Sequence, residues 1–162
     1  MEKYRYQVKL TGDNIDKIKK HQTTKVIQYP DFKEAFEYVD NLFPNHNVKM
    51  ATIYQCDHNF LNDLGYVGVG GFFARVQKII VIPDILDFPK QEKSSLWDSL
   101  QGTVTQDEVV VHELLHYCSD KQSNCNSSLQ MEEEFAYGYS VGYLKSKGQS
   151  DDDIIRQNYL PY

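Results

Sequence analysis

A five-residue motif in the last third of the chain carries the side chains best suited to chemistry. The motif His112-Glu113-Leu114-Leu115-His116 places two histidines four positions apart. Residues four apart on a helix lie on one face, so the two imidazoles converge on a single point. Two neutral imidazole nitrogens make half of a tetrahedral zinc site. Glu113, about 100° further round the helix, can reach a metal-bound water without ligating the metal. The motif predicts a hydrolytic zinc centre.

The residues around the motif strengthen this prediction. Between Val109 and Cys118, Glu113 is the only Asp, Glu, Lys or Arg. Burying two histidines and a carboxylate on such an apolar helix costs several kcal/mol unless the polar groups are satisfied. A metal ion would satisfy all three. The competing interpretation is a pair of surface histidines on an amphipathic helix.

A hydrolytic zinc needs a third protein ligand and one open position for water. No histidine follows His116, and the three upstream histidines stand in unremarkable settings: His21, His46 and His58. Cys118 and Cys125 are conceivable ligands, although Cys118 faces another side of the helix. The remaining candidates are three consecutive acids near the start of the next predicted helix: Glu132, Glu133 and Glu134.

Helical periodicity separates these three acids. Glu133 shares a stripe with small and aromatic residues, Ala136, Tyr137 and Ser140, which can lie against the motif helix. Glu134 shares a face with Gly138 and Val141, and Glu132 projects toward another stripe. We therefore predict Glu133 as the third ligand, with Glu134 as the alternative. The competing interpretation is that the acids form a solvated face that complements the helix dipole.

The elements that position these residues are read from periodicity and capping signals. Alternating residues predict strands over 4–10, 25–29, 48–55, 72–76 and 78–82. Helical patterns predict helices over 13–20, over 32–43 with Asp31 as the N-cap, from about 106 and over 128–147. The segments 84–104 and 120–127 are expected to be mainly loop, and a short helix is expected from 150. The pattern predicts a single α+β domain over residues 1–162, with a short mixed sheet, an active-site helix and a following ligand helix.

On these residues, the chain resembles the zincin metallopeptidases, and within them the gluzincins, over about residues 72–147. Residues 109–118 look like the zincin helix signature, and Glu133-Glu134-Phe135-Ala136 is similar to the segment that carries the gluzincin glutamate ligand. An aspartate that orients a zinc histidine usually follows, and Tyr137 stands at that position. The resemblance implies a small zincin-like fold. It also implies that an edge strand before the motif helix binds extended substrate, and residues 78–82 are expected to fill this role.

The predicted function is a zinc-dependent metallopeptidase that contains one Zn²⁺ per chain and acts on a protein or peptide substrate. His112, His116 and Glu133 would hold the metal, and Glu113 would activate its bound water. Two alternatives stay open. One is a non-catalytic zinc-containing binding or structural module. The other is a zinc amidohydrolase that acts on a non-protein amide.

Composition and charge limit the possible partners. The chain has 162 residues, of which 41% are hydrophobic and 25% charged, as in ordinary globular domains. A formal net charge of −6 argues against a nucleic-acid-binding surface, which needs basic residues. No apolar run reaches the roughly 18 residues of a membrane span, and no signal-peptide pattern is seen. Three cysteines, an odd number, fit a reducing compartment. We expect a cytoplasmic protein with no membrane or nucleic-acid partner.

Overall fold

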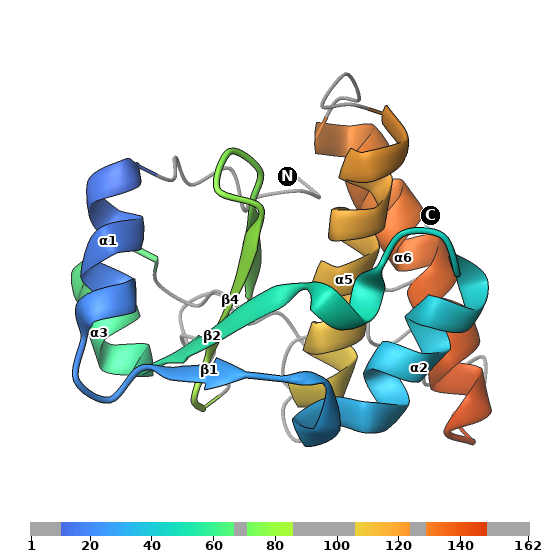
Figure 1. The fold of residues 1–162 in the computed structure, drawn as a ribbon, viewed down its shortest axis with the longest axis horizontal. Coiled ribbons are helices and arrows are strands. Elements are labelled where there is room, and N and C mark those ends of the chain that lie inside the picture. Colours follow the sequence, from blue (N-terminus) through green and yellow to red (C-terminus); the bar gives the residue numbers. More distant parts are fainter. Residues whose placement is uncertain (1–10, 67–70, 86–105, 124–128, 149–162) are drawn as a thin grey trace, which may run out of the picture.

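The computed structural model describes residues 11–66, 71–85, 106–123 and 129–148, and within these the side chains of all but 122, 123, 129–134 and 137 (Figure 1). The helices are α1 (Gly12–Lys20), α2 (Lys33–Leu42), α3 (His58–Asp63), α5 (Gln106–Ser123) and α6 (Leu129–Ser146), with 3-10 turns η1 (Tyr29–Phe32) and η2 (Val48–Met50). The strands are β1 (Lys25–Ile27), β2 (Thr52–Cys56), β3 (Phe72–Ala74) and β4 (Ile79–Pro83). The predicted α+β class with a short mixed sheet is confirmed.

The four strands form one sheet in the order β1-β2-β4-β3. β4 is parallel to β2, with Ile80 opposite Ile53, and antiparallel to β3, with Ile80 also opposite Phe73. β4 is therefore an interior strand, and the prediction that residues 78–82 form the edge strand is wrong. Within the described residues, β3 is the edge strand on this side of the sheet.

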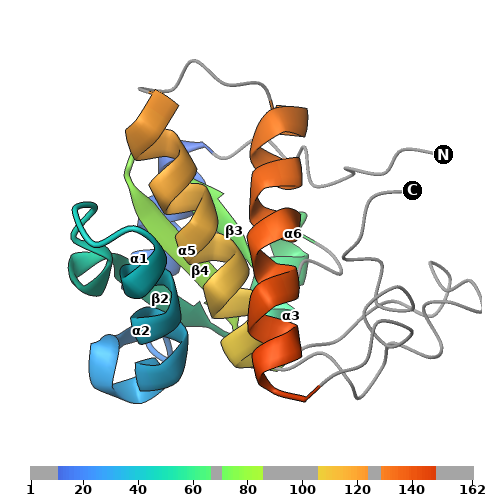
Figure 2. The same cartoon turned by 90° about the vertical axis from the view of Figure 1, so that its right-hand side faces the viewer.

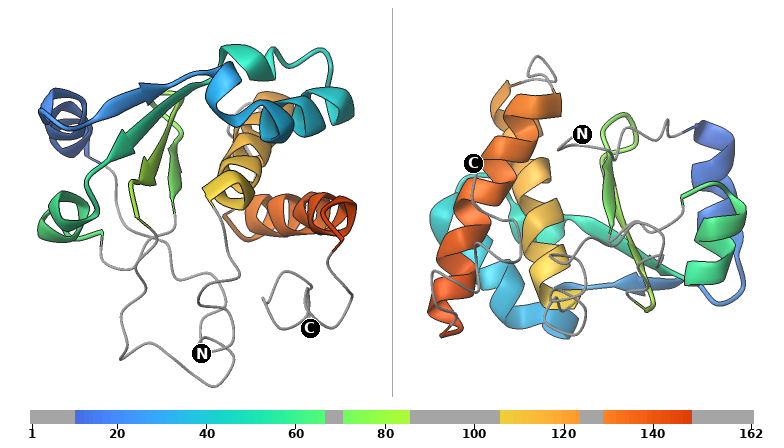
Figure 3. Two further views of the ribbon diagram at one scale, coloured as in Figure 1. Left: turned by 90° about the horizontal axis from the view of Figure 1, so that it is seen from below. Right: turned by 180° about the vertical axis from the view of Figure 1, so that it is seen from behind.

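Helices cover the sheet on both faces. α2, α5 and α6 lie on one side, and α1 and α3 lie on the other (Figures 1 and 3). The side chains of β4 alternate between the two layers: Ile80 and Ile82 pack into the core with α2 and α5, whereas Ile79 and Val81 pack into the core with α1 and α3. All five residues of β4 are buried, because helices cover both of its faces.

Several predicted boundaries differ from the structure. Asp31 lies in η1, where its carboxylate accepts a hydrogen bond from the Gln28 amide, and Phe32 is the N-cap of α2. The predicted strand over 48–55 begins as η2 and becomes β2 only at Thr52. α5 continues to Ser123, so Asp120 is helical rather than part of a loop. α3 was not predicted at all.

Other sequence predictions fall outside the described residues. These are the strand over 4–10, the loop over 86–104 and the final helix from 150. Among the helices that the structure does describe, none combines the length and the apolar character needed to cross a membrane. The two long helices, α5 and α6, instead pack against each other.

Candidate metal centre

The motif helix, α5, lies between the sheet and the helices α2 and α6, and the side chains from Glu108 to Asp120 are buried, except for half-buried His112. Apolar residues on several faces of α5 belong to the same core: Val109, Val110, Val111, Leu114 and Leu115. This burial explains why apolar residues surround the motif on every face of the helix. It also means that each polar group on α5 occupies a largely water-excluded position, where an electrostatic partner matters most.

The two motif histidines point toward each other. His116 Nε2 lies 3.2 Å from His112 Nε2, and the ring centroids are 4.9 Å apart. His116 is 7% exposed, whereas His112 is half-buried. Two nitrogens that bind one tetrahedral zinc at about 2.0–2.1 Å lie about 3.3–3.4 Å apart. The observed separation fits this requirement. A direct hydrogen bond between the two imidazoles, with one ring donating, is the metal-free alternative.

Glu113 is buried between α5 and the start of β3. It is 5% exposed. A Cβ built on Gly71 would lie 2.8 Å from Val109 Cγ1 and 3.4 Å from Glu113 Cγ. The backbone at Gly71 therefore approaches α5 more closely than a residue with a side chain could. The sequence prediction of the site did not include Gly71.

β3 and the turn after it follow α5 at three successive points. Gly71 contacts Val109 and Glu113, and two residues later the Phe73 ring meets the Tyr117 ring at a centroid distance of 6.1 Å. Two residues further, Arg75 Nε lies 3.2 Å from Asp120 Oδ1. The edge strand is thus held alongside the motif helix (Figure 2).

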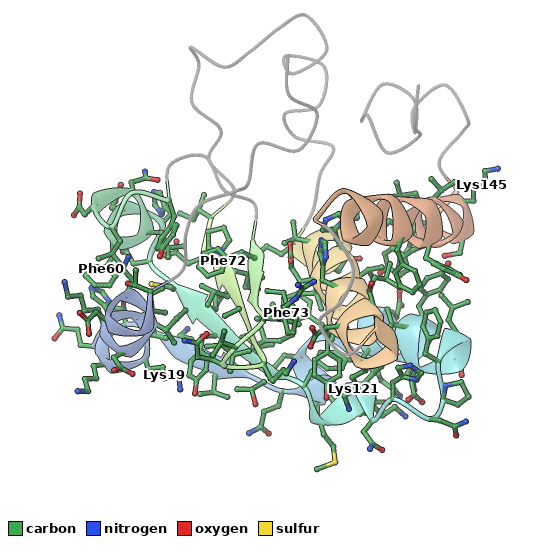
Figure 4. The ribbon with its side chains drawn as sticks, turned by 90° about the horizontal axis from the view of Figure 1, so that it is seen from above. Lys19, Phe60, Phe72, Phe73, Lys121 and Lys145 are labelled. Atoms are coloured by element: carbon green, nitrogen blue, oxygen red, sulfur yellow. The ribbon has the colours of Figure 1, made fainter. Side chains whose placement is uncertain are left out.

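The two faces of β3 have different surroundings. Phe73 packs into the core that contains α5, whereas Phe72 packs into the core that contains α1 and α3, where it contacts Tyr66. Figure 4 shows the two rings on opposite sides of the strand. The Phe73 side of the strand is therefore the side that faces the motif helix.

α6 runs antiparallel to α5, and one polar contact sets their register (Figure 2). The Tyr143 hydroxyl donates a hydrogen bond to Asp107 Oδ2 at 2.5 Å. Counting nine residues along α5 from Asp107 reaches His116, and counting nine back along α6 from Tyr143 reaches position 134. The register therefore brings positions 133 and 134 level with His116.

The buried residues of α6 define the face that packs on α5. Ala136, Ser140 and Tyr143 are 0%, 3% and 2% exposed, whereas Gly138 and Lys145 are exposed. Helical periodicity places position 133 on the buried stripe and position 134 on the face of Gly138. Position 132 lies at the border of the buried stripe. The side chains of all three acids lie outside the described set.

Among the described side chains, no third His, Cys, Asp or Glu joins the histidine pair. The upstream histidines have other neighbours: His21 contacts Thr23, His46 contacts Phe43, and His58 contacts Asp84. Cys118 is fully buried, and burial raises the pKa of its thiol to about 12. Cys118 packs into the apolar core with Val111 and Leu115, and among the described side chains it does not complete a three-ligand group with the histidine pair.

Comparison with known proteins supplies no relative for this chain. No family model, no curated protein and no solved structure matches it. The functional interpretation therefore depends on the geometry of the site: two converging imidazoles, a neighbouring buried carboxylate, an edge strand beside them and a run of acids at the level of His116.

Proposed function

We propose that this chain is a zinc-dependent metallopeptidase whose metal is held by His112, His116 and Glu133. One observation carries the proposal: the Nε2 atoms of His112 and His116 lie 3.2 Å apart, with the Glu113 carboxylate buried one residue away. This is the donor set and spacing that a hydrolytic zinc requires of one helix. As a zincin-like domain, the chain would be of the gluzincin type, since the third ligand comes from a later helix.

The choice of Glu133 is supported by the packing of α6. Position 133 lies on the stripe that continues through Ala136 and Ser140 toward α5, at the level of His116. Position 134 lies on the stripe that includes exposed Gly138. A carboxylate at 133 would approach the histidine pair from the facing helix, which leaves one side of the metal open for water.

The metal and Glu113 would contribute different parts of the chemistry. When bound, zinc supplies Lewis acidity that activates water and polarises a carbonyl. Glu113 follows His112 directly and is buried; its carboxylate would accept a proton from the attacking water and pass it to the leaving amine. A purely structural zinc site would have no use for this carboxylate. Its presence favours the hydrolase over the non-catalytic module.

The substrate would be an extended peptide, and β3 is the strand suited to bind it. Within the described residues, β3 pairs with β4 on one edge, and no strand pairs with its other edge. Strand addition at such an edge satisfies the main chain of an extended peptide. The backbone at Gly71, just before β3, lies so close to α5 that a Cβ there would be 3.4 Å from Glu113 Cγ. A peptide paired with β3 would therefore pass close to the histidine pair, which supports a peptide over a small amide as substrate.

The proposal is tested by comparing zinc-loaded wild type with Glu113→Gln on casein, with fragments detected by mass spectrometry. The glutamine keeps the shape of the side chain but cannot accept a proton, so cleavage should fall by about three orders of magnitude or more while zinc content stays constant. Glu34→Gln is the matched control, since Glu34 lies on α2 with a side chain 72% exposed. Equal cleavage by wild type and Glu113→Gln would refute the assigned role.

A further inference from the structure

Among the described residues, Asp120 is the most deeply buried acid on α5. Two cationic side chains pair with its carboxylate. It lies one helical turn beyond His116 and is 2% exposed. Arg75 Nε lies 3.2 Å from Asp120 Oδ1, and Lys78 Nζ donates to Asp120 Oδ2. Both partners come from the turn between β3 and β4, so one carboxylate joins α5 to this hairpin.

Helical spacing alone could mistake Asp120 for a metal ligand, because positions 112, 116 and 120 follow one another at intervals of four. The structure argues against this role. Each Asp120 oxygen faces a cation, and no group of three candidate ligands is found among the described side chains. The carboxylate is occupied by the hairpin, not directed at the histidine pair.

In the turn between β3 and β4, the backbone allows the side chains of both Arg75 and Lys78 to reach Asp120. Lys78 adopts a left-handed backbone conformation with φ of +58°, which is uncommon for a residue with a branched or long side chain. Val76, at the tip of the turn, is 87% exposed and contributes no packing that could hold the turn in place. The two ion pairs with Asp120 therefore join this end of the hairpin to α5.

The opposite end of β3 is where the chemistry lies. The backbone at Gly71 approaches α5 so closely that it leaves no room for a Cβ beside Val109, and Phe73 packs against Tyr117 between the two ends. A strand that is fixed to a helix at one end by ion pairs and at the other by close packing has little freedom to tilt. The distance between the open edge of β3 and the motif residues is thereby set.

We propose that Asp120, with Arg75 and Lys78, is a positioning residue that holds β3 at the distance from His112 and Glu113 at which a bound extended peptide meets the metal centre. This inference rests on the proposed function, since it assigns β3 as the strand that binds substrate. It adds a role for a residue that touches neither the metal nor the peptide. Asp120 acts through the hairpin.

The test measures peptide binding apart from hydrolysis. Fluorescein-labelled casein is titrated with zinc-loaded Glu113→Gln protein, which binds substrate without cleaving it, and with the same protein carrying Asp120→Asn. Without the two ion pairs of Asp120, β3 can shift. Because a misplacement of about 1 Å can lower a reaction rate up to 100-fold, we expect the smaller effect of about a tenfold rise in the Kd for casein. Zinc content should stay the same, because His112 and His116 are unchanged.

Two further variants separate positioning from a general loss of structure. Asp40→Asn removes another acid that pairs with a lysine, Lys49, but on α2, and should leave casein binding unchanged. Lys78→Gln removes one of the two cations, on a half-exposed side chain, and keeps Arg75. It therefore tests the ion pairs of Asp120 even if Asp120→Asn fails to fold. It should weaken casein binding in the same direction, by a smaller factor.

The outcomes distinguish this inference from the proposed function. If folded Asp120→Asn and Lys78→Gln proteins bind casein as tightly as their parent, the positioning role is wrong. If the Glu113→Gln protein binds no casein at all, β3 is not a substrate strand and the inference also falls. If wild type binds casein without cleaving it, the proposed hydrolysis is wrong. Weaker casein binding by Asp120→Asn would then still support the positioning role of Asp120.

Discussion

The hydroxyl of Tyr143 on α6 donates a hydrogen bond of 2.5 Å to Asp107 Oδ2 on α5, near the first residue of α5 and the last residues of α6. Both residues lie on the interface between the helices, and Tyr143 is 2% exposed. Because α5 and α6 are antiparallel, this contact fixes which residues face each other along the whole pair. It brings the acids near the start of α6 level with His116.

Removing this contact should destabilise the protein and loosen the register. A hydrogen bond to a charged group contributes about 1.5–3 kcal/mol, so Tyr143→Phe should lower the free energy of unfolding by about 2 kcal/mol. Urea denaturation of the zinc-free protein measures this change. Tyr139→Phe is the control, because Tyr139 lies on the same helix and is 40% exposed. Equal destabilisation by the two variants would mean that the Tyr143 hydroxyl has no special role.

The same contact predicts a pH dependence. Burial, reinforced by the hydrogen bond to Asp107, raises the pKa of Tyr143 above its ordinary value of 10.0. A folded-state pKa above the unfolded value contributes stability that is fully present below about pH 10 and is lost as the pH rises further. Wild-type stability should therefore fall between pH 10 and 11, and part of this fall should be absent in Tyr143→Phe. A parallel decline in both proteins would contradict the assignment.

Three single substitutions identify the third metal ligand: Glu132→Gln, Glu133→Gln and Glu134→Gln. Positions 132 and 133 lie on the two flanks of the buried stripe of α6 that includes Ala136 and Ser140, and we expect the ligand at 133. Glu133→Gln should weaken zinc binding by about 10–100-fold or more, since losing even an outer partner of a ligand costs that much. The other two act as matched controls, and competition with a chelator measures the affinity. A dominant effect at 134 would mean that α6 is rotated by about 100°.

Gly71→Ala should damage the site without removing its metal. The added methyl group would lie 2.8 Å from Val109 Cγ1 and 3.4 Å from Glu113 Cγ, so the Val109 side chain, the backbone at residue 71 or α5 must shift. We expect casein cleavage to fall about 10–100-fold while zinc content stays constant. Gly138→Ala is the control, because a Cβ at this exposed position of α6 meets nothing within 4 Å. Unchanged cleavage by Gly71→Ala would show that the close approach of β3 has no function.

Local patterns predicted the elements that carry the chemistry. The four-residue spacing of His112 and His116 correctly indicated imidazoles that converge, because this convergence depends only on helix geometry. The α6 boundaries also followed from local signals, since Gly148 adopts a left-handed conformation with φ of +85° just beyond the helix. Both features are encoded within a few residues.

The order of the strands could not be read in the same way. Residues 78–82 were expected at the sheet edge because the family resemblance implies a substrate-binding edge strand before the motif helix, whereas β4 is interior. The unbroken apolar run Ile79-Ile80-Val81-Ile82 contained the signal, since a strand buried on both faces shows no alternation. The edge position of β3 depends on pairing with a strand that follows it, which no local pattern encodes.

Asp120 was misplaced for a similar reason. Its polar neighbours, Ser119 and Lys121, suggested a loop after the motif. In the structure the helix continues to Ser123, and Arg75 and Lys78 neutralise the buried carboxylate of Asp120. These partners lie about 45 residues upstream, so their charge compensation appears only once the hairpin is packed on α5.

The metal content of the purified protein tests the central claim most directly. Inductively coupled plasma mass spectrometry of wild type, after dialysis against zinc and then against metal-free buffer, should find one zinc per chain, because two imidazoles and one carboxylate complete a three-ligand set. His116→Ala should contain almost none, while His58→Ala, which removes the histidine that contacts Asp84, should contain as much as wild type. A wild type without zinc, or a His116→Ala protein with full zinc occupancy, would contradict the account.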